Sequence, residues 1–465
     1  MPRSVYTMDP MAEQIHDLAS KPMSIPNALE SLRAEMEGRW LHQVFVEPSG
    51  FSRLLGDRSV VVLGDVGSGK TAVRLMLAHQ VARRPDAPLV VHWQPGSATF
   101  RSLSGYSAVQ QLEEDLRRIL GEIALSLMMG LGQEPERHHR APAWVQETVN
   151  EFIHTFVPRI QRQVARIGTD LPEEGRALLQ QIAAQPIRQS EQEGPEIEVL
   201  EWVREIVDMA LHLGWRGIWV LVDGLEAWLD LEIAQVEEML RTLMSALNLF
   251  EIPNFSLKLF APVRLKPLLA QSSGVVRRRF DLYSLTWTSE ELRLLLERRL
   301  AGAFGRTDFS LKELCAASKW PAWLAEYGGG IPRGWLELAR PVVDEYIRQG
   351  RTLSKAEWQA TIRTYPPQLR IDLRQEKVFL GYKEIANVTP TAYRILHCLY
   401  THHQRRCSRE ELVRHVFGEE AFNTDWRSQI DTAIWRLRKA IEPDSKKPIY
   451  VVTQRGRGIG LHHAW

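Results

Sequence analysis

Apolar residues follow two spacings along this 465-residue chain. Four short runs rich in Val, Leu and Ile are continuous rather than alternating, which is typical of strands buried on both faces of a parallel sheet. Longer stretches with helical spacing separate them, so the pattern predicts a doubly wound α/β fold. The predicted strands are Ser59–Leu63, Pro88–Trp93, Ile218–Val222 and Ser256–Ala261.

A long polar and leucine-rich stretch separates the second and third predicted strands. It runs from Trp93 to Trp215, far longer than a usual crossover, and most of it has helical periodicity. We therefore expect a helical insertion at about residues 98–214. Two roles stay open for it: a surface for a partner or a signal, and a packing elaboration of the core.

Helical patterns continue after the last strand and stop at Tyr365-Pro366-Pro367, where we place a domain boundary. Ser354 and Glu357 have capping-box spacing and predict the start of one short helix. The expected domains are an N-terminal extension (1–39), an α/β core (40–287), a helical lid and linker (288–364) and a C-terminal domain (368–465). The other lid helices are predicted at Ser289–Ala301, Ser310–Ala317 and Arg333–Gln349.

The distribution of charge separates the C-terminal domain from the rest. The chain has 58 basic and 57 acidic residues, but 17 basic and 11 acidic ones follow from Pro366 onward. A basic domain on a slightly acidic body suggests that this domain binds a polyanion. No apolar run reaches the roughly 20 residues of a membrane span, and the N-terminus has no signal pattern, so we expect a cytoplasmic protein.

The cysteines and histidines do not predict a metal site. Cys315, Cys398 and Cys407 are an odd number and widely spaced, so we expect reduced, inert thiols. For the three His-His pairs, we expect no acidic or cysteine partner at the sequence spacing that is typical of metal ligands. These pairs are His138-His139, His402-His403 and His462-His463.

A glycine-rich loop directly follows the first predicted strand and precedes a helix, Thr71–Arg83. It fits the phosphate-binding pattern G-x-x-x-x-G-K-[ST], in which backbone N–H groups face the phosphates. Lys70 would reach the β- and γ-phosphates of ATP, and Thr71 would bind Mg²⁺. The loop residues are Gly64, Asp65, Val66, Gly67, Ser68, Gly69, Lys70 and Thr71.

Two acidic residues complete the predicted nucleotide site. Asp223 ends the buried run Trp219–Val222, which we expect to pair beside the first strand, and it would hold Mg²⁺ through water. Glu226 would orient the attacking water, although a surface or capping role is also open.

These motifs resemble the STAND branch of the AAA+ relatives, which are signal-transducing P-loop ATPases, over about residues 40–350. The resemblance implies that Arg264 lies near the γ-phosphate and that Arg333, in Gly330-Ile331-Pro332-Arg333, contacts nucleotide from the lid. The family usually has two acids where this chain has Glu226 and then Ala227. Hydrolysis is therefore expected to be slow, with nucleotide exchange as the switch.

The last hundred residues predict strands, three helices and a terminal hairpin, which is the order of a winged helix (α+β). The predicted strands span Arg370–Leu380. The helices are Pro390–His402, Arg409–Phe417 and Trp426–Glu442, and the hairpin is Ile449–Leu461. In such modules the third helix enters the major groove of double-stranded DNA, and the hairpin contacts the backbone or the minor groove.

This segment resembles the winged helix of OmpR/PhoB-type transcription regulators. Val388-Thr389-Pro390, Ser408–Leu412, Ile434–Lys439 and Tyr450–Thr453 carry the resemblance. A winged helix that binds protein instead of DNA stays open. The expected DNA-binding residues are Arg427, Ser428, Asp431, Thr432, Trp435, Arg436, Arg438, Arg455 and Arg457.

The sequence therefore predicts a P-loop ATPase with a helical insertion and lid, followed by a winged helix. The leading hypothesis is a transcription regulator in which ATP and an unidentified signal change packing or homo-oligomerisation. Two alternatives are an AAA+ ATPase that assembles on DNA, like initiators and loaders, and a STAND-type defence or conflict sensor. The sequence does not assign the partner of the insertion.

Overall fold

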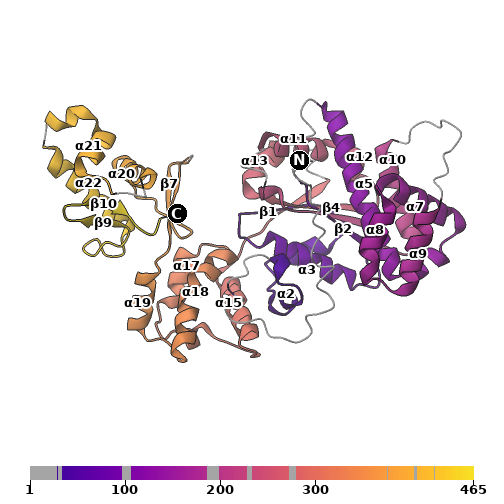
Figure 1. Ribbon diagram of the computed structural model, residues 1–465, viewed down its shortest axis with the longest axis horizontal. Helices are drawn as coiled ribbons and strands as arrows, with labels where there is room; N and C mark the ends of the chain where they lie inside the picture. The colour runs from indigo at the N-terminus through magenta and orange to yellow at the C-terminus, as the bar shows by residue number, and fades with distance from the viewer. Residues whose placement is uncertain are drawn as a thin grey trace. The chain divides into compact units, whose positions relative to one another are not determined.

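The computed structural model describes residues 29, 34–96, 106–185, 198–227, 233–271, 279–373, 375–402, 406–423 and 425–464. These residues form two compact units, which divide between Thr286 and Trp287 (Figure 1). Most of the expected N-terminal extension (1–39) lies outside the described residues. Its described end contains η1 (Ala34–Met36), followed by α2 (Arg39–Val44) and η2 (Phe51–Leu55).

The first unit is built on a five-stranded parallel sheet of order β2-β3-β4-β1-β5. Every residue of the three inner strands is buried, because helices cover both faces; Figure 1 shows α3 on one side and α11 on the other. The α/β class expected from the sequence is therefore confirmed. The strands are β1 (Ser59–Gly64), β2 (Leu89–Trp93), β3 (Ile218–Val222), β4 (Phe255–Pro262) and β5 (Phe280–Ser284).

The strand order corrects one expectation. β3, which Asp223 follows, does not pair with β1, because β4 lies between them and pairs with both. The edge strand β5 was also missing from the prediction. Only Phe280 and Tyr283 of its five residues are buried, so it lacks a continuous apolar run.

The long insertion packs into the same hydrophobic core as the sheet. Its central helix α5 buries one apolar stripe against β2 and neighbouring helices. A Cβ on Gly175 of α9 would lie 1.7 Å from the carbonyl oxygen of Gly132, so these helices touch through glycines. The helices of this unit are α3 (Lys70–Ala82), α5 (Ala108–Gln133), α6 (Glu136–Arg140), α7 (Ala143–Phe156), α8 (Ile160–Ile167), η3 (Gly168–Asp170), α9 (Glu173–Ala184), α10 (Val199–His212), η4 (Leu225–Ala227), α11 (Ile233–Ser245), α12 (Leu247–Phe250), η5 (Val263–Leu265) and α13 (Lys266–Gln271).

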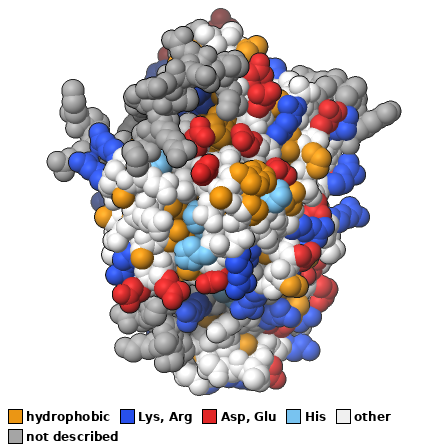
Figure 2. Space-filling model, turned by 90° about the vertical axis from the view of Figure 1, so that its right-hand side faces the viewer, with side chains coloured by type: hydrophobic (Ala, Val, Ile, Leu, Met, Phe, Trp, Pro, Cys, Tyr) orange, Lys and Arg blue, Asp and Glu red, His pale blue; other side chains and the backbone are white. Residues whose placement is uncertain are grey.

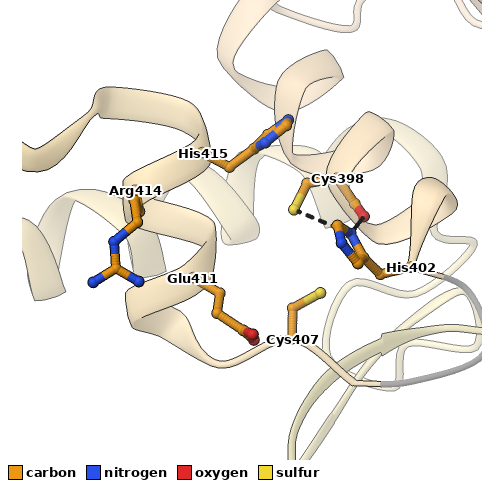
Figure 3. A pocket seen from close by; sticks show the side chains of 6 residues that line it. All are labelled: Cys398, His402, Cys407, Glu411, Arg414 and His415. Carbon is orange, nitrogen blue, oxygen red and sulfur yellow. Dashed lines mark hydrogen bonds between the residues drawn. The ribbon is translucent and has the colours of Figure 1, made fainter.

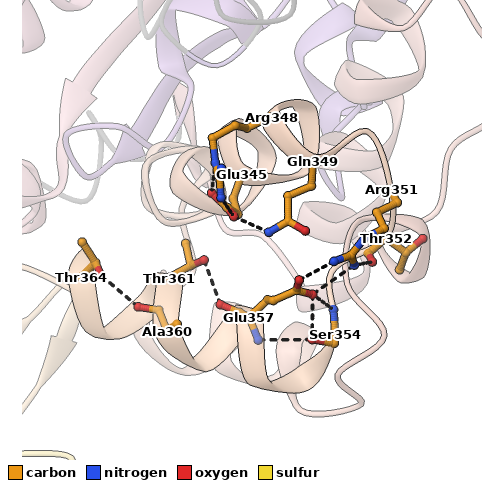
Figure 4. Close-up of polar contacts among 10 residues, drawn as sticks. All are labelled: Glu345, Arg348, Gln349, Arg351, Thr352, Ser354, Glu357, Ala360, Thr361 and Thr364. Carbon is orange, nitrogen blue, oxygen red and sulfur yellow. Dashed lines mark hydrogen bonds and ion pairs between the residues drawn. The ribbon is translucent and has the colours of Figure 1, made fainter.

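The second unit begins with the helices expected as a lid, and side-chain caps start several of them. At α19, Glu357 accepts hydrogen bonds from the backbone N–H (2.8 Å) and the hydroxyl (2.7 Å) of Ser354 and pairs with Arg351 (Figure 4). The hydrogen bond from Arg351, followed by those from Ser354, lowers the pKa of Glu357 to about 2. The helices are α15 (Ser289–Ala303), α16 (Leu311–Leu314), α17 (Trp320–Tyr327), α18 (Pro332–Gln349) and α19 (Lys355–Thr364).

The rest of the second unit is a winged helix around its own core. A three-stranded antiparallel sheet precedes three helices, and a two-stranded hairpin follows them. No described helix is long and apolar enough to cross a membrane. The elements are β6 (Leu369–Asp372), β7 (Lys377–Leu380), β8 (Lys383–Glu384), α20 (Pro390–Thr401), α21 (Arg409–Phe417), η6 (Glu419–Asn423), α22 (Trp426–Ile441), β9 (Val451–Gln454) and β10 (Gly458–Leu461).

The lid helices and the winged helix contact each other through the turn between β7 and β8. The backbone N–H of Tyr382 donates to the carbonyl oxygen of Tyr327 at 2.8 Å, and its hydroxyl donates to Glu337 at 2.8 Å. Lys383 forms an ion pair with Glu326 at 2.5 Å. Two helices, α17 and α18, thus hold one turn of the winged helix.

Candidate nucleotide and DNA sites

The glycine-rich loop curls between the end of β1 and the start of α3. Gly67 (φ 84°) and Gly69 (φ 89°) have left-handed backbone conformations that favour glycine. A Cβ at Gly64 would lie 2.4 Å from the hydroxyl oxygen of Ser68. These glycines therefore suit the tight turn of the backbone here. The turn places the N-terminus of α3 close to the C-terminal end of β1.

The ammonium group of Lys70 is buried beside this loop. It donates to the carbonyl oxygens of Gly64 (2.9 Å) and Asp65 (3.0 Å) and forms an ion pair with Glu226 at 2.5 Å. Glu226 lies in η4, directly after β3. The structure thus brings together a lysine and a glutamate that are far apart in the sequence.

Asp223 lies beside Thr71 at the same edge. The hydroxyl of Thr71 donates to Oδ2 of Asp223 at 2.9 Å, and the backbone N–H of Gly224 donates to Oδ1 at 2.8 Å. Because β4 separates β1 from β3, this pair spans the width of one strand. A hydroxyl and a carboxylate within hydrogen-bond distance, next to a phosphate loop, form a donor set that fits Mg²⁺.

Sequence reasoning missed a buried arginine at this site. Arg74, one turn after Thr71 on α3, is fully buried, and its Nε donates to Oδ2 of Asp223 at 3.1 Å. Its Nη1 lies 2.6 Å from Nδ1 of His92 on β2. Burial, and secondarily Arg74, lower the pKa of His92 to about 3, so the ring is neutral and can accept that bond. The motif gave no signal for this contact, because it depends on how α3 lies across the sheet.

The two arginines expected near the phosphates lie on different units. Arg264 is exposed in η5, directly after β4, at the same end of the sheet as the glycine-rich loop. Arg333 is the second residue of α18 in the second unit, half-buried. The next residue in that helix, Gly334, contacts Tyr382: a Cβ there would lie 2.7 Å from the tyrosine ring.

The third helix of the winged helix, α22, has one buried and one exposed face. Five of its residues, Ile430, Ala433, Ile434, Leu437 and Ile441, are buried. Six of the seven predicted DNA-binding residues on it are exposed, with Trp435 at 51%. Asp425 caps the helix by accepting from the N–H of Ser428. The exposed ones are Arg427, Ser428, Asp431, Thr432, Trp435 and Arg436.

Two of the predicted residues form contacts inside the domain. The guanidinium of Arg438 donates to the carbonyl oxygen of Val451 (2.9 Å) and to the hydroxyl of Thr453 (2.7 Å), which ties α22 to β9. Burial lowers the pKa of Arg438. Asp431 accepts from Nε of Arg409 on α21 at 2.8 Å. Both side chains therefore have structural partners in addition to any role on DNA.

The hairpin of β9 and β10 presents two arginines at its tip. Arg455 and Arg457 are exposed on either side of Gly456, which has φ 74°. They lie in a tight turn, where the N–H of Arg457 donates to the carbonyl oxygen of Gln454 at 3.0 Å. Figure 2 shows another face of the molecule, on which basic and acidic side chains are interspersed. Two basic side chains on one small tip suit a phosphate backbone better than a mixed face does.

Comparisons with known proteins match the C-terminal part of the chain. Residues 383–461 match the family described as "Transcriptional regulatory protein, C terminal". The phosphate regulon transcriptional regulatory protein PhoB of Escherichia coli is 38% identical over 90 residues, which are 19% of this chain and 38% of PhoB. PhoB of Klebsiella pneumoniae is 36% identical over the same shares. The chain thus spans 38% of the length of these relatives.

One solved structure overlaps most of the chain at a low score. It is the Aeropyrum pernix ORC2 protein in ADPNP and ADP complexes, with a TM-score of 0.32 and 14% identity, covering 93% of this chain and 89% of that one. A score this low carries no argument about fold or function. The assignment rests on the chain's own topology, its motifs and the C-terminal match: residues 383–461 are a DNA-binding winged helix of the OmpR/PhoB type, in a chain whose first unit has a P-loop α/β fold.

Proposed function

We propose that this protein is a DNA-binding transcription regulator whose affinity for DNA depends on bound ATP or ADP. One observation carries the proposal: a phosphate loop with a Thr71–Asp223 pair is in the same chain as an OmpR/PhoB-type winged helix. The proposal extends the DNA-binding class, which the C-terminal match supports, to control by nucleotide.

In the nucleotide site, Lys70, Thr71 and the loop amides would bind the phosphates and Mg²⁺. Mg²⁺, when bound, would neutralise charge on the phosphate oxygens, held by Thr71 and Asp223. Lys70 now pairs with Glu226 at 2.5 Å, so a γ-phosphate would compete with Glu226 for the ammonium group. Binding of ATP, which presents both the β- and the γ-phosphate to Lys70, would then release the Glu226 carboxylate more fully than binding of ADP.

Hydrolysis in this site would be slow. Glu226 is the one acid that follows Asp223 closely in the described residues, where the resembling family usually has two. The buried guanidinium of Arg74 also reduces the negative charge that Asp223 offers to Mg²⁺. A slowly hydrolysing site suits a switch that is set by nucleotide exchange.

Transmission to the winged helix would use the contact at Tyr382. Arg333, the proposed nucleotide contact of the lid, is next to Gly334, and Gly334 packs against the Tyr382 ring. A shift of the N-terminus of α18 would therefore displace the turn between β7 and β8. Activation would also bring copies of the chain together, because two linked winged helices bind DNA more tightly than one.

DNA binding by the full chain tests the proposal. The probe is the DNA upstream of its own gene, with a scrambled duplex as control, in ATP, in ADP and without nucleotide. Arg436→Ala should weaken binding to the preferred site, and Lys70→Ala should remove the effect of ATP. The matched controls are Arg363→Ala and Lys266→Ala, which remove one exposed positive charge elsewhere in each unit. Equal binding to both duplexes in every nucleotide state would reject the proposal.

A further inference from the structure

Two cysteines and a histidine of the winged helix come together beside the wing. The sulfur atoms of Cys398 and Cys407 and a ring nitrogen of His402 all lie within 4.8 Å of one another. Figure 3 shows the three side chains directed toward a common point. The expectation that no cysteine stands at ligand spacing from the His402-His403 pair was therefore wrong: Cys398 precedes His402 by one helical turn.

The local structure prepares His402 to bind a metal ion. Its Nδ1 lies 2.8 Å from the backbone carbonyl oxygen of Cys398. A carbonyl oxygen only accepts hydrogen bonds, so Nδ1 carries the ring proton and Nε2 has the lone pair. Nδ1 also lies 3.9 Å from the sulfur atom of Cys398, so Nε2 is the nitrogen that would bind the metal. A histidine that ligates a metal usually donates its other N–H to a carbonyl in this way.

Cys407 is fixed by the strand that ends the domain. Its N–H donates to the carbonyl oxygen of Ile459, and the N–H of Ile459 donates back, both at 2.8 Å. Gly458 (φ 97°), the first residue of β10, also lies close to Cys407, because a Cβ at Gly458 would lie 2.5 Å from the carbonyl oxygen of Cys407. Cys407 therefore pairs with β10 close to the hairpin turn, whereas Cys398 lies in α20 and His402 directly follows that helix.

A pocket of about 360 Å³ opens onto the three ligand atoms. Glu411, Arg414 and His415 of α21 also line it. Figure 3 shows the guanidinium of Arg414 directed away from the sulfur atoms, and it pairs with Glu419. Oε2 of Glu411 accepts from the N–H of Ser408 at 2.7 Å. The pocket thus offers room for a fourth ligand, and the arginine that lines it is directed away from the sulfur atoms.

We propose that Cys398, His402 and Cys407 bind one Zn²⁺ ion, with the fourth ligand in this pocket. Two thiolates and an imidazole favour zinc over the hard cations Mg²⁺ and Ca²⁺. Each thiol loses a proton on binding, so the pair of thiolates neutralises the 2+ charge. The ion would join the end of α20 to the segment that pairs with β10 of the hairpin, which presents Arg455 and Arg457.

Cobalt titration of the full-length protein tests the site. After removal of metals with a chelator and reduction of thiols, Co²⁺ should bind at one ion per chain with thiolate-to-cobalt absorption, and Zn²⁺ should displace it. Cys407→Ser and His402→Ala should each weaken Co²⁺ binding about 100-fold or more. This exceeds the effect of losing a residue that only hydrogen-bonds to a metal ligand. Cys315→Ser is the matched control, because it removes a buried thiol of the lid region and should leave the titration unchanged.

Alkylation of the unmutated protein covers the case in which a variant does not fold. Zn²⁺ should protect Cys398 and Cys407 from alkylation and leave Cys315 unaffected. It should also slow hydrogen exchange at the amides of Cys407 and Ile459 about tenfold or more. The proposal fails if Co²⁺ gives no thiolate-to-cobalt absorption, or if Cys315→Ser weakens Co²⁺ binding as much as Cys407→Ser does. It also fails if Cys398 and Cys407 form a disulfide and the protein still binds no metal after that disulfide is reduced.

Discussion

At the scale of single residues, the contacts of Asp223 explain most about the proposed nucleotide site. Its carboxylate accepts hydrogen bonds from Thr71, from the amide of Gly224 and from Arg74. A motif search predicts the first contact, because the loop and the strand-end acid have recognisable patterns. It cannot predict the Arg74 contact, which depends on how α3 lies across the sheet.

Loss of Arg74 should destabilise the first unit. Arg74→Met leaves a buried carboxylate without its ion-pair partner, and breaking such a pair costs about 3–5 kcal/mol. Asp223→Asn in the same chain should then cost much less than it does alone. Urea unfolding of the four proteins in this double-mutant cycle measures the coupling.

Arg216→Met is the control for that cycle. Arg216 pairs with Asp57 and Asp86 on the surface, where an ion pair contributes about 1 kcal/mol or less. If Arg74→Met and Asp223→Asn were additive, the buried pair would have no energetic significance.

A second buried carboxyl group predicts a pH dependence. Asp115 of α5 is fully buried, with Arg118 at 3.7 Å. Burial raises its pKa from 3.8 to about 7, although Arg118 opposes the shift. In the unfolded chain the group loses its proton near pH 4, so the free energy of unfolding should fall as pH rises from about 4 to about 7.

The shift corresponds to at most about 4 kcal/mol, from about 1.4 kcal/mol per pKa unit. Asp115→Asn should remove this part of the pH dependence. Its free energy of unfolding, compared with that of the original protein, should therefore be higher at pH 8 than at pH 5. Urea unfolding at the two pH values decides it. A variant with the same dependence as the original protein would show that Asp115 is not the group responsible.

At the scale of secondary structure, continuous apolar runs predict the buried strands well, since each run is a local pattern. The edge strand β5 was missed because two buried residues out of five do not form a run. The position of β4 between β1 and β3 was missed because strand order depends on contacts between distant segments. The cluster of Cys398, His402 and Cys407 was missed for the same reason, since Cys407 reaches it through pairing with Ile459.

The two arginines near the end of α22 should differ in effect. Arg438→Ala removes two hydrogen bonds of a charged group to β9, each worth about 1.5–3 kcal/mol, so hydrogen exchange in the hairpin should speed up. Arg436→Ala removes an exposed side chain and should weaken DNA binding while exchange stays as it was. Exchange measured by mass spectrometry, beside DNA affinity, separates the two roles. Equal exchange in both variants would show that Arg438 does not hold the hairpin.

At the scale of the whole molecule, each unit has its own core, and the winged helix is joined to the lid through Tyr382. Tyr382→Ala should leave DNA binding without nucleotide nearly unchanged but reduce the difference between ATP and ADP. Tyr365→Ala, which removes an exposed ring near the same linker, is the control. A full nucleotide effect in Tyr382→Ala would place the coupling elsewhere.

The most direct measurement is the Kd for the preferred DNA site in saturating ATP and in saturating ADP, together with the Kd values for ATP and for ADP, each with and without that DNA. The account predicts a difference of at least about fivefold between ATP and ADP, and DNA must then change the ATP-to-ADP affinity ratio by the same factor, since coupling between two binding sites is reciprocal. Identical DNA affinities in the two nucleotides would contradict the central claim that nucleotide controls this regulator.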